Sequence, residues 1–449
     1  MCRGKARWTM GGVLLWGMAA GAATFPGPAE VFPFGVYVGG NDPLPGVRAQ
    51  GQSVEACIER TCADLAAHAF NCVWPNNLDF ALLPAWLDSA QRHGLRVVPQ
   101  GGGFPSYLLW WFDGWQAAVE EQMKPFYYET ARKYRDHPAL LAYSVVEEIP
   151  PDPPILEAVR ELTQLTAALD PHHPMIVLYN RASSAELAAR MVRPRVLAWD
   201  GYPFFADPRN GPSTAAGRRS YFGRQIQRFY EAGRAIGAPV WVMGQGMDLA
   251  VVENGRIVRW AWRRPTPTEM RWQVWTALLH GAKGFFLFLY GSSPGFPENG
   301  EYLRGLVDES GQTTEIYEAA AQVSRDLEPY KPLLLQLEQA PPDREVLYWE
   351  NNEAVEGRTF IHRDTGIRYL LLVNHDTVQP RRAEVELGLF PRYLSETDRL
   401  VDLRTGRQFT YETLPSLELE PGDGTILFVG SDAEWATHQR TSASPEAGA

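Results

Sequence analysis

The sequence predicts an α/β fold in which a (β/α)8 barrel, or TIM barrel, is followed by a small C-terminal antiparallel β-sandwich. Between residues 31 and 335, eight short apolar segments alternate with amphipathic helical segments. Eight such repeats within about 300 residues are typical of this barrel. Across residues 341–430 the pattern changes to short β-type runs separated by turn residues, without helical periodicity, which indicates the sandwich.

The predicted barrel strands are runs of aliphatic and aromatic residues, most of them bounded by glycine, proline or asparagine. Runs that are apolar on both faces are typical of parallel strands covered by helices. In chain order the predicted strands are 31–40, 70–74, 95–99, 140–146, 175–179, 196–199, 239–243 and 284–290. The regular order of strands and helices, more than any single segment, supports the fold prediction.

The helices between the strands have recognisable ends. Ser53 can cap the helix that follows the first strand. Before the last strand, Thr266 and Glu269 match a capping box with Pro267 at the first helical position, and Gly281 closes the helix. Glu269 is therefore interpreted as a structural residue.

The two ends of the chain fall outside the barrel and the sandwich. Three basic residues precede an apolar stretch that ends in the small residues A-G-A, so residues 1–22 are expected to be a signal peptide. The apolar stretch is short for a membrane span, which predicts a secreted or periplasmic protein with no span in the mature chain; an uncleaved anchor is the alternative. The polar, small-residue-rich end predicts a disordered tail at 431–449.

The charge and the cysteine content argue against several classes of partner. The net charge of −11 becomes −14 once the three basic residues of the signal peptide are removed, which argues against a nucleic-acid partner. Cys57 and Cys62 lie five residues apart on a predicted helix and point in different directions, so no local disulfide is expected. Because no paired cysteine or histidine motif occurs, the sequence predicts neither a metal site nor a cofactor.

Polar and aromatic residues end the predicted strands, at the carboxyl edge where barrel enzymes keep their catalytic groups. The clearest case is H-P-A-L-L-A-Y-S-V-V-E-E-I-P at 137–150, in which an apolar run stops at two glutamates. The residues at the strand ends are Trp74, Asn76, Gln100, Glu147, Glu148, Asn180, Asp200, Tyr202, Gln245 and Tyr290. Such a set, without a basic cluster or a phosphate loop, suits a neutral, hydroxyl-rich carbohydrate, with carboxylates as acid and base. The alternative is that the glutamate pair is only a solvated strand end.

Tryptophans supply candidate surfaces for sugar rings, which stack on flat aromatic side chains. The chain has 15 of them, and Trp110 and Trp111 lie in an aromatic loop after the third strand. This loop is expected to form a sugar platform, although it could instead be the core of a folded-back loop. Trp260 and Trp262 follow a turn at 253–255, so they are expected on a hairpin after the seventh strand, with both rings on one face.

Three motifs of the predicted barrel carry a family resemblance. They are the run at 137–150, W-D-G-Y-P at 199–203, and R-R-P-T-P-T-E-M-R with L-L-H-G-A-K-G-F at 263–271 and 278–285. On these motifs, residues 31–335 resemble the large clan of (β/α)8 glycoside hydrolases whose acid/base glutamate ends strand four. The resemblance implies that Glu148 is the acid/base residue. It also implies that Glu147 stands where the clan usually has an asparagine or aspartate that orients the sugar. A C-terminal β-sandwich is also common among such enzymes.

The chain departs from the clan at the end of strand seven, where Gln245 replaces the nucleophilic glutamate. A carboxamide cannot form the glycosyl-enzyme intermediate. Three interpretations stay open. Asp200 could be the second carboxylate, as the base of an inverting enzyme, although it could also be only a turn residue before glycine. Gln245 could orient a substrate N-acetyl or hydroxyl group that attacks instead, or the barrel could bind glycans without cleaving them.

The sequence thus predicts an exported glycoside hydrolase that cleaves O-glycosidic bonds of oligo- or polysaccharides. Glu148 would protonate the leaving oxygen and Asp200 would be the second catalytic carboxylate. The remaining strand-end residues, together with Trp110 and Trp111, would bind the substrate. The alternative from another class is a non-catalytic glycan-binding protein on the same scaffold.

Overall fold

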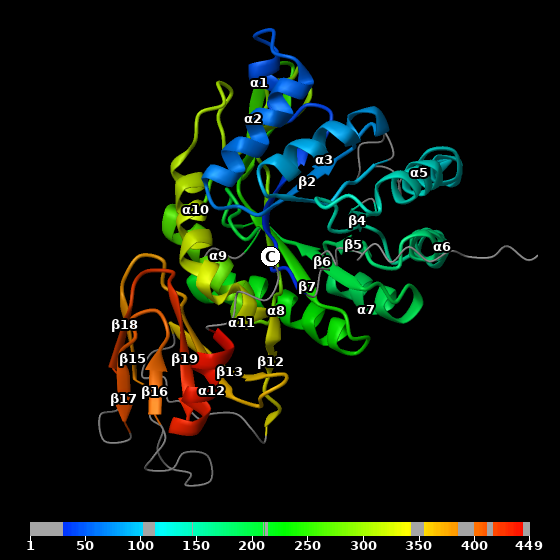
Figure 1. Ribbon diagram of the computed structural model, residues 1–449. Helices are drawn as coiled ribbons and strands as arrows, with labels where there is room; N and C mark the ends of the chain where they lie inside the picture. Colours follow the sequence, from blue (N-terminus) through cyan, green and yellow to red (C-terminus); the bar gives the residue numbers. More distant parts are fainter. Residues whose placement is uncertain are drawn as a thin grey trace, which may run out of the picture.

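The main feature of the computed structural model is a curled sheet of eight parallel strands surrounded by helices (Figure 1). The structure describes residues 30–101, 113–145, 147–209, 211, 214–342, 354–384, 399–410 and 416–442. The strands are β1 (Phe34–Gly39), β2 (Cys72–Asn76), β3 (Arg96–Val97), β4 (Tyr143–Ser144), β5 (Met175–Tyr179), β6 (Val196–Asp200), β7 (Val240–Gln245) and β10 (Phe285–Phe288). Each of the eight predicted barrel strands overlaps one of them.

The order of the strands around the sheet is β3-β2-β1-β10-β7-β6-β5-β4. The segments of the two edge strands, β3 and β4, are linked by three backbone hydrogen bonds. Val97 N donates to Ala139 O (2.7 Å), Leu141 N to Val97 O (3.0 Å) and Ser144 N to Pro99 O (3.1 Å). The sheet therefore fits an α/β barrel, the architecture that the alternation of strands and helices predicted.

Helices surround this sheet and connect its strands (Figure 1). They are α2 (Val54–Ala67), α3 (Leu83–Arg92), α5 (Lys124–Tyr134), α6 (Pro153–Leu169), α7 (Ala182–Met191), α8 (Ala215–Arg234), α9 (Pro267–Leu279) and α10 (Glu315–Leu327). Shorter helical turns are α1 (Pro45–Arg48), η1 (Phe80–Leu82), α4 (Trp115–Ala118), η3 (Val119–Met123), η4 (Glu328–Tyr330) and α11 (Lys331–Gln336). Ser53 caps α2 by accepting a hydrogen bond from Ala56 N (3.1 Å), and Thr266 and Glu269 form the predicted capping box of α9.

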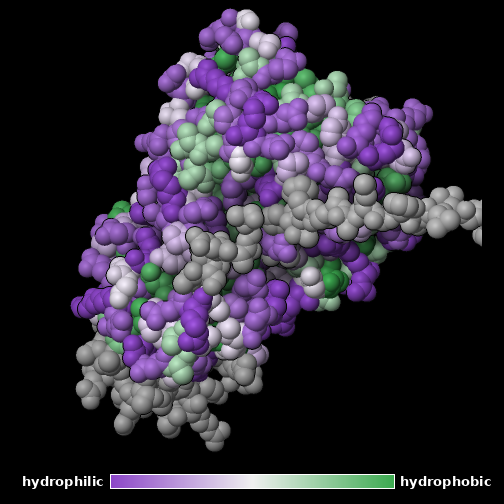
Figure 2. Space-filling view, in the orientation of Figure 1, coloured by the Kyte–Doolittle hydropathy of each residue, from purple (hydrophilic) through white to green (hydrophobic). Residues whose placement is uncertain are grey.

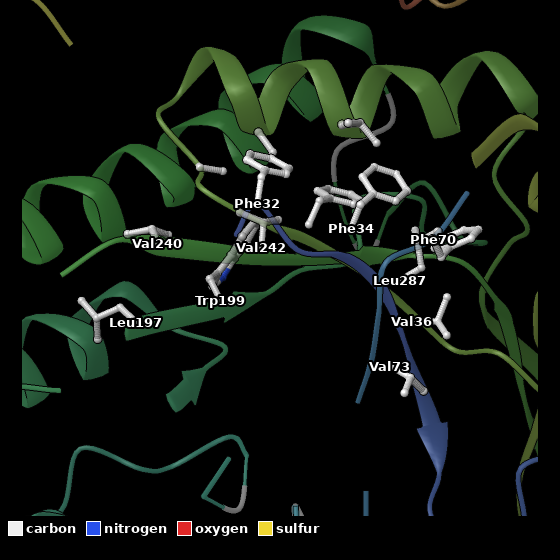
Figure 3. Close-up of a cluster of buried hydrophobic side chains, with 14 of the residues drawn as sticks. Phe32, Phe34, Val36, Phe70, Val73, Leu197, Trp199, Val240, Val242 and Leu287 are labelled. Carbon is white, nitrogen blue, oxygen red and sulfur yellow. The ribbon is translucent and has the colours of Figure 1, made fainter. Parts of the chain in front are cut away.

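Strand side chains alternate between two separate hydrophobic clusters, because successive residues of a strand point to opposite faces. In β6, Leu197 and Trp199 belong to the cluster between sheet and helices, part of which Figure 3 shows. Val196 and Ala198 belong to the second cluster, inside the curled sheet. Asp200 follows Ala198 by two residues, so the same alternation directs it to the inside of the sheet at the carboxyl edge.

A smaller antiparallel sheet of three strands follows β7, in the order β11-β8-β9. Its strands are β8 (Asp248–Glu253), β9 (Arg256–Trp262) and β11 (Gly300–Arg304). β8 and β9 form the hairpin predicted at residues 253–255, which is therefore confirmed.

The two tryptophans of this hairpin lie on opposite faces of the small sheet, so the prediction of one shared face is wrong. Leu249 pairs with Trp262 and Ala250 with Trp260, which leaves Ala261 as an extra residue in a β-bulge. The extra residue shifts the alternation of side chains by one position. Trp262 consequently packs in one cluster with Leu249, whereas Trp260 packs in another with Ala250.

The C-terminal part is rich in antiparallel strands (Figure 1, yellow to red). They are β12 (Leu337–Gln339), β13 (Val355–His362), β14 (Arg368–Asn374), β15 (Arg381–Glu384), β16 (Arg399–Asp402), β17 (Gln408–Thr410), β18 (Ser416–Leu419) and β19 (Gly424–Gly430). One sheet has the order β12-β13-β14-β19-β16-β17, and β15 pairs with β18 in another. A single hydrophobic cluster joins the two sheets, with Leu370 and Leu427 from the larger and Ala383 and Leu417 from the smaller.

The end of the chain differs from the predicted disordered tail, because Asp432–Ser442 form helix α12. Trp435 and His438, one helical turn apart, pack against Phe428 of β19 with ring centroids 5.0 and 5.8 Å away. Two aromatic residues in an otherwise polar segment form this contact face, which is too weak a periodicity to read from the sequence. Residues 443–449 lie outside the described residues.

Hydrophilic residues cover most of the face seen in Figure 2, with apolar residues in small groups. In the described part of the chain, the exposed large apolar side chains, Tyr128, Val258, Phe296 and Val378, come from four separate segments. No helix among the described residues combines the length and the apolar character that crossing a membrane requires.

The barrel helices and the C-terminal strands meet at Glu356, a buried carboxylate on β13. Arg219 of α8 donates through Nε to its Oε2 (2.7 Å), and His375 Nε2 lies 3.2 Å from the same oxygen. Trp272 of α9 donates to His375 Nδ1 (2.9 Å), which leaves Nε2 to donate to the carboxylate. Burial alone would raise the pKa of Glu356, but the hydrogen bond from His375 and the charges of His280 and Arg219 hold this pKa well below its ordinary range.

Glu356→Gln is expected to lower the free energy of unfolding by about 3 kcal/mol, because it removes the negative charge that pairs with Arg219 and accepts the hydrogen bond of His375. The wild-type protein should also lose stability as the pH falls below about 4.3, since a carboxylate with a lowered pKa contributes fully above the pKa of the unfolded chain and loses this contribution as the pH falls toward its pKa in the folded protein. Glu356→Gln should lack this part of the pH dependence. Chemical denaturation at several pH values measures both effects.

Glu338→Gln is the matched control for this prediction. The exposed carboxylate of Glu338 pairs with Arg363 at 3.1 Å, so its loss should cost less than about 1 kcal/mol. An equal loss of stability in the two variants would contradict the role given to Glu356.

Candidate active site

A pocket of about 600 Å³ lies at the carboxyl edge of the sheet, beside β5 and β6. Its lining includes Glu148, Asn180, Asp200, Tyr202 and Trp262. The first four are strand-end residues that the sequence predicted as site residues. They come together because side chains that follow the inward-pointing residues of β5 and β6 gather at this edge of the sheet. The volume is in the range of small-molecule sites in proteins.

Glu148 is the more exposed carboxylate of this pocket. Its backbone lies in the left-handed region (φ +53°). Non-glycine residues rarely adopt this conformation, and those that do are often found at functional sites. Burial raises the pKa of Glu148 and the negative charge of Glu301 raises it further, whereas the charge of Arg181 and a hydrogen bond with Asn180 lower it. Glu148 therefore holds a proton to higher pH than an ordinary glutamate.

Asp200 lies deeper in the protein, with 6 % of its surface exposed. Burial raises its pKa well above the ordinary value, and the charges of Glu148 and Glu147 raise it further, against a hydrogen bond with Tyr202. Its Oδ1 atom is buried and has no hydrogen-bond partner among the described residues. A carboxyl group that is buried beside two other carboxylates favours the neutral acid form.

Glu147 is held by a chain of buried side chains that begins inside the sheet. The hydroxyl of Tyr37 donates to Glu147 Oε1 (2.6 Å), and Gln100 Nε2 lies 3.5 Å from that hydroxyl. Gln100 Oε1 in turn accepts from Trp74 Nε1 (3.1 Å) and Ser144 Oγ (3.2 Å). Trp74 and Gln100 were predicted to contact substrate. Their burial favours a supporting role, in which they fix Tyr37 and thereby Glu147.

The side chain of Gln245 is fully buried and bound to the backbone on three sides. Its Oε1 accepts from Phe204 N (3.0 Å), and its Nε2 donates to Met247 O (3.2 Å) and Arg263 O (2.7 Å). The carboxamide thus ties the end of β7 to the segment after β6 and to both ends of the hairpin. This arrangement favours a structural role for Gln245 over the substrate contact that the sequence predicted.

Tyr290 lies on the other side of the sheet from the pocket. Its hydroxyl donates to Asp64 Oδ2 of α2 (2.6 Å), which also accepts from Tyr317 of α10 (2.8 Å). Because β10 ends at Phe288, the inward alternation of that strand does not extend to Tyr290, which packs in the helix-facing cluster. The structure therefore favours a structural role for Tyr290 as well.

Three predicted site residues remain. Asn76 is half-buried at the end of β2 and does not line it. Trp110 and Trp111 lie outside the described residues, so the sugar platform stays a prediction.

Sequence reasoning missed Glu301 and Tyr37. Glu301 of β11 stands in one row of the small sheet with Val251 and Arg259, on the face that carries Trp262. No local pattern marks Glu301, because its position depends on pairing with a strand far earlier in the chain. Tyr37 could have been predicted from the sequence, because it is the single inward-pointing residue of V-Y-V in the first strand.

The described residues were also compared with the arrangements that bind metal ions or activate thiols. No group of three or more histidine, cysteine or carboxylate side chains among the described residues is arranged to hold a metal ion. Cys57, Cys62 and Cys72 are buried free thiols. Burial raises the pKa of the Cys62 thiol to about 12, which makes it a poor nucleophile.

Comparison with known proteins relates the fold to glycoside hydrolases. No family model and no curated protein matches the chain. The β-galactosidase from Bacillus circulans sp. alkalophilus has a TM-score of 0.57 at 10 % identity, and the match covers 89 % of this chain and 99 % of that one. The β-D-glucuronidase of Dictyoglomus thermophilum has a TM-score of 0.48 at 14 % identity, covering 66 % of this chain and 51 % of that one.

A family 39 glycoside hydrolase from Bacteroides cellulosilyticus WH2 has a TM-score of 0.46 at 13 % identity, covering 90 % of this chain and 81 % of that one. At these identities the similarity concerns the fold alone. Of these three structures, the β-galactosidase is the one similar enough to support an argument. The chain accordingly has a glycosidase-like fold.

Glu301→Gln is expected to lower the pKa of Glu148, because it removes a negative charge that raises this pKa. Arg181→Gln should have the opposite effect and raise it. NMR titration of the side-chain carboxyl carbons measures both shifts, with Glu148→Gln used to assign the resonance. Glu298→Gln, an exposed glutamate in the same segment as Glu301, is the control and should leave the titration of Glu148 unchanged. Shifts of the same sign in Glu301→Gln and Arg181→Gln would contradict this electrostatic description.

Proposed function

We propose that this protein is an exported glycoside hydrolase that cleaves O-glycosidic bonds of oligo- or polysaccharides. The observation that carries the proposal is that Glu148 and Asp200 line the same pocket and that the charge of Glu148 raises the pKa of Asp200. Two coupled carboxyl groups that titrate at different pH values can hold one proton between them, the state that an acid/base pair needs. The glycosidase-like fold supports the substrate class, and the basic-then-apolar N-terminus supports export.

The difference in burial between the two carboxyl groups suggests their roles. Asp200 is the more buried of the two, and burial favours its protonated form, so it is the proposed general acid. It gives its proton to the glycosidic oxygen as the bond from that oxygen to the anomeric carbon breaks. Glu148 is the more exposed and is the proposed base, which takes a proton from the water that attacks the anomeric carbon. The clan resemblance implies the reverse allotment, with Glu148 as the acid.

Either allotment describes an inverting reaction, in which water and not an enzyme group attacks the sugar. The internal hydrogen bonds of Gln245 support this choice, because they leave no nucleophile at the end of β7. Glu147, Asn180 and Tyr202 are proposed to orient sugar hydroxyl groups, and the ring of Trp262 is proposed to pack against the sugar. The proposal includes a closed barrel over residues 31–335 and a β-sandwich over 341–430.

Hydrolysis of a panel of plant, algal and bacterial glycans by the purified protein identifies the substrate. On an unactivated substrate, Glu148→Gln and Asp200→Asn should each lower kcat/KM by about a hundredfold or more, because each removes a proton-transfer group. NMR of the first product anomer should show inversion. Retention of configuration would contradict the inverting mechanism.

Leaving-group dependence separates the two roles. On an aryl glycoside with a good leaving group, Asp200→Asn should keep most of its activity, since such a leaving group needs no acid, whereas Glu148→Gln should stay impaired. Azide should rescue Glu148→Ala and give a glycosyl azide of inverted configuration. The opposite outcome, in which Glu148→Gln keeps the aryl activity and Asp200→Asn loses it, would return Glu148 to the acid role.

A non-catalytic glycan-binding protein is the second candidate, and Gln245 in place of a nucleophile is the observation that favours it. Under this alternative the wild-type protein would bind a glycan of the panel without cleaving it. Glu148→Gln would then bind the same glycan with little change in affinity.

A further inference from the structure

A second pocket, of about 490 Å³, lies next to the small three-stranded sheet, on the side opposite the carboxylate pocket. Trp260, Arg263, Arg264 and Arg304 line it, whereas Trp262 lines the first pocket. The β-bulge in β9 separates these two tryptophans onto opposite faces. No basic cluster is recognisable in the sequence, because the arginines come from two segments that the pairing of β8 with β9 and β11 brings together.

Positive charge exceeds negative charge around this pocket. The buried Asp248 accepts from Arg304 Nε (2.9 Å), and Arg304 Nη2 contacts its second oxygen. Arg264 Nε lies 3.8 Å from the same carboxylate, so two guanidinium groups share one negative charge. Asp207 at the rim is already paired with the exposed Arg209 at 2.7 Å.

Other carboxylates lie near these arginines, and the charge of Glu315 also acts on Arg264. Arg263 forms two hydrogen bonds to Glu269 (2.6 and 2.7 Å), and Arg218 lies 4.0 Å from that carboxylate. Asp308 and Glu309 line a neighbouring pocket of about 420 Å³ that also borders Arg264 and Arg304. An anionic ligand is therefore expected in the pocket of Trp260 and not in the neighbouring one.

Arg264 has donor capacity that the described residues do not use. Its Nη2 donates to Gly305 O at 3.3 Å, whereas its Nε is buried without a hydrogen-bond partner in the described part of the chain. The buried Nε is closed to a ligand, but Nη1 donates no hydrogen bond in the described part of the chain, so this group remains for an acceptor on a ligand. The guanidinium of Arg304 stacks on the half-buried ring of Trp260 at 4.8 Å, so an apolar surface adjoins the cationic group.

We propose that this pocket binds a sugar that carries an oxyanion group, either a carboxylate or a sulfate. Arg264 donates to the oxyanion, and Trp260 packs against the sugar ring. Guanidinium groups suit both anions, because their planar set of donors matches two oxygens at once. This second site is independent of the proposed hydrolysis, since it requires no catalysis in the first pocket.

The test is to titrate the purified full chain with glucuronate, glucose 6-sulfate and glucose. Calorimetry or tryptophan fluorescence measures the binding. Glucuronate, glucose 6-sulfate or both should bind, more weakly as salt rises, whereas glucose should bind at least tenfold more weakly. Arg264→Gln should lower the affinity for the anionic sugar by about tenfold or more, as should Trp260→Leu. Arg264→Gln leaves Asp248 paired with Arg304, so its fold is expected to be retained and thermal unfolding checks this.

Two control variants keep the outcome decisive. Arg209→Gln removes the same charge from the exposed rim and should leave the affinity unchanged. Arg181→Gln alters the first pocket and should also have no effect. Equal binding of glucose and the anionic sugars, full affinity in Arg264→Gln, or loss of binding only in Arg181→Gln would each overturn the proposal.

Discussion

The alternation of side chains along the parallel strands is the constraint on which both the core and the candidate site depend. Each strand must give one set of side chains to the helices and the other set to the inside of the curled sheet. Tyr37, Asp200 and Gln245 all follow the inward phase of their strands. At the carboxyl edge the inward residues have no further layer of core to pack against, so polar groups can be retained there without filling the centre of the sheet.

Different degrees of burial then give these polar groups different protonation behaviour. Asp200 is buried deeply enough to favour its neutral form, whereas Glu148 is more exposed and is influenced by Glu301 from the small sheet. The small sheet therefore does more than cover the barrel, because its two faces carry different chemistry. One face carries Glu301, whose charge acts on Glu148, and the other gathers arginines around Trp260.

The sequence predicted the barrel strands well, because their signal is local. Each strand is a short apolar run followed by a polar residue, and the capping box of α9 and the β8–β9 hairpin are equally local patterns. Glu148, Asn180, Asp200 and Tyr202 could be assigned to one site because parallel strands share an edge.

The predictions that failed or fell short depend on information that no local window contains. The single extra residue Ala261 reverses the face of Trp262, and no sequence pattern marks it. Glu301 acts on Glu148 only because long-range strand pairing places β11 beside β8. Gln245 and Gln100 look like site residues by position, and only their hydrogen bonds show that their polar atoms are used within the protein.

The hydrogen bonds of Gln245 have an evolutionary consequence. One base change separates a glutamine codon from a glutamate codon, yet an ionised glutamate at this position would face the carbonyl oxygens of Met247 and Arg263, to which it could donate nothing. A buried carboxylate against two acceptors would be repelled, and the hairpin would lose its attachment to β7. A carboxylate at the end of β7 therefore requires compensating substitutions around the hairpin, although a single base change supplies the glutamate itself.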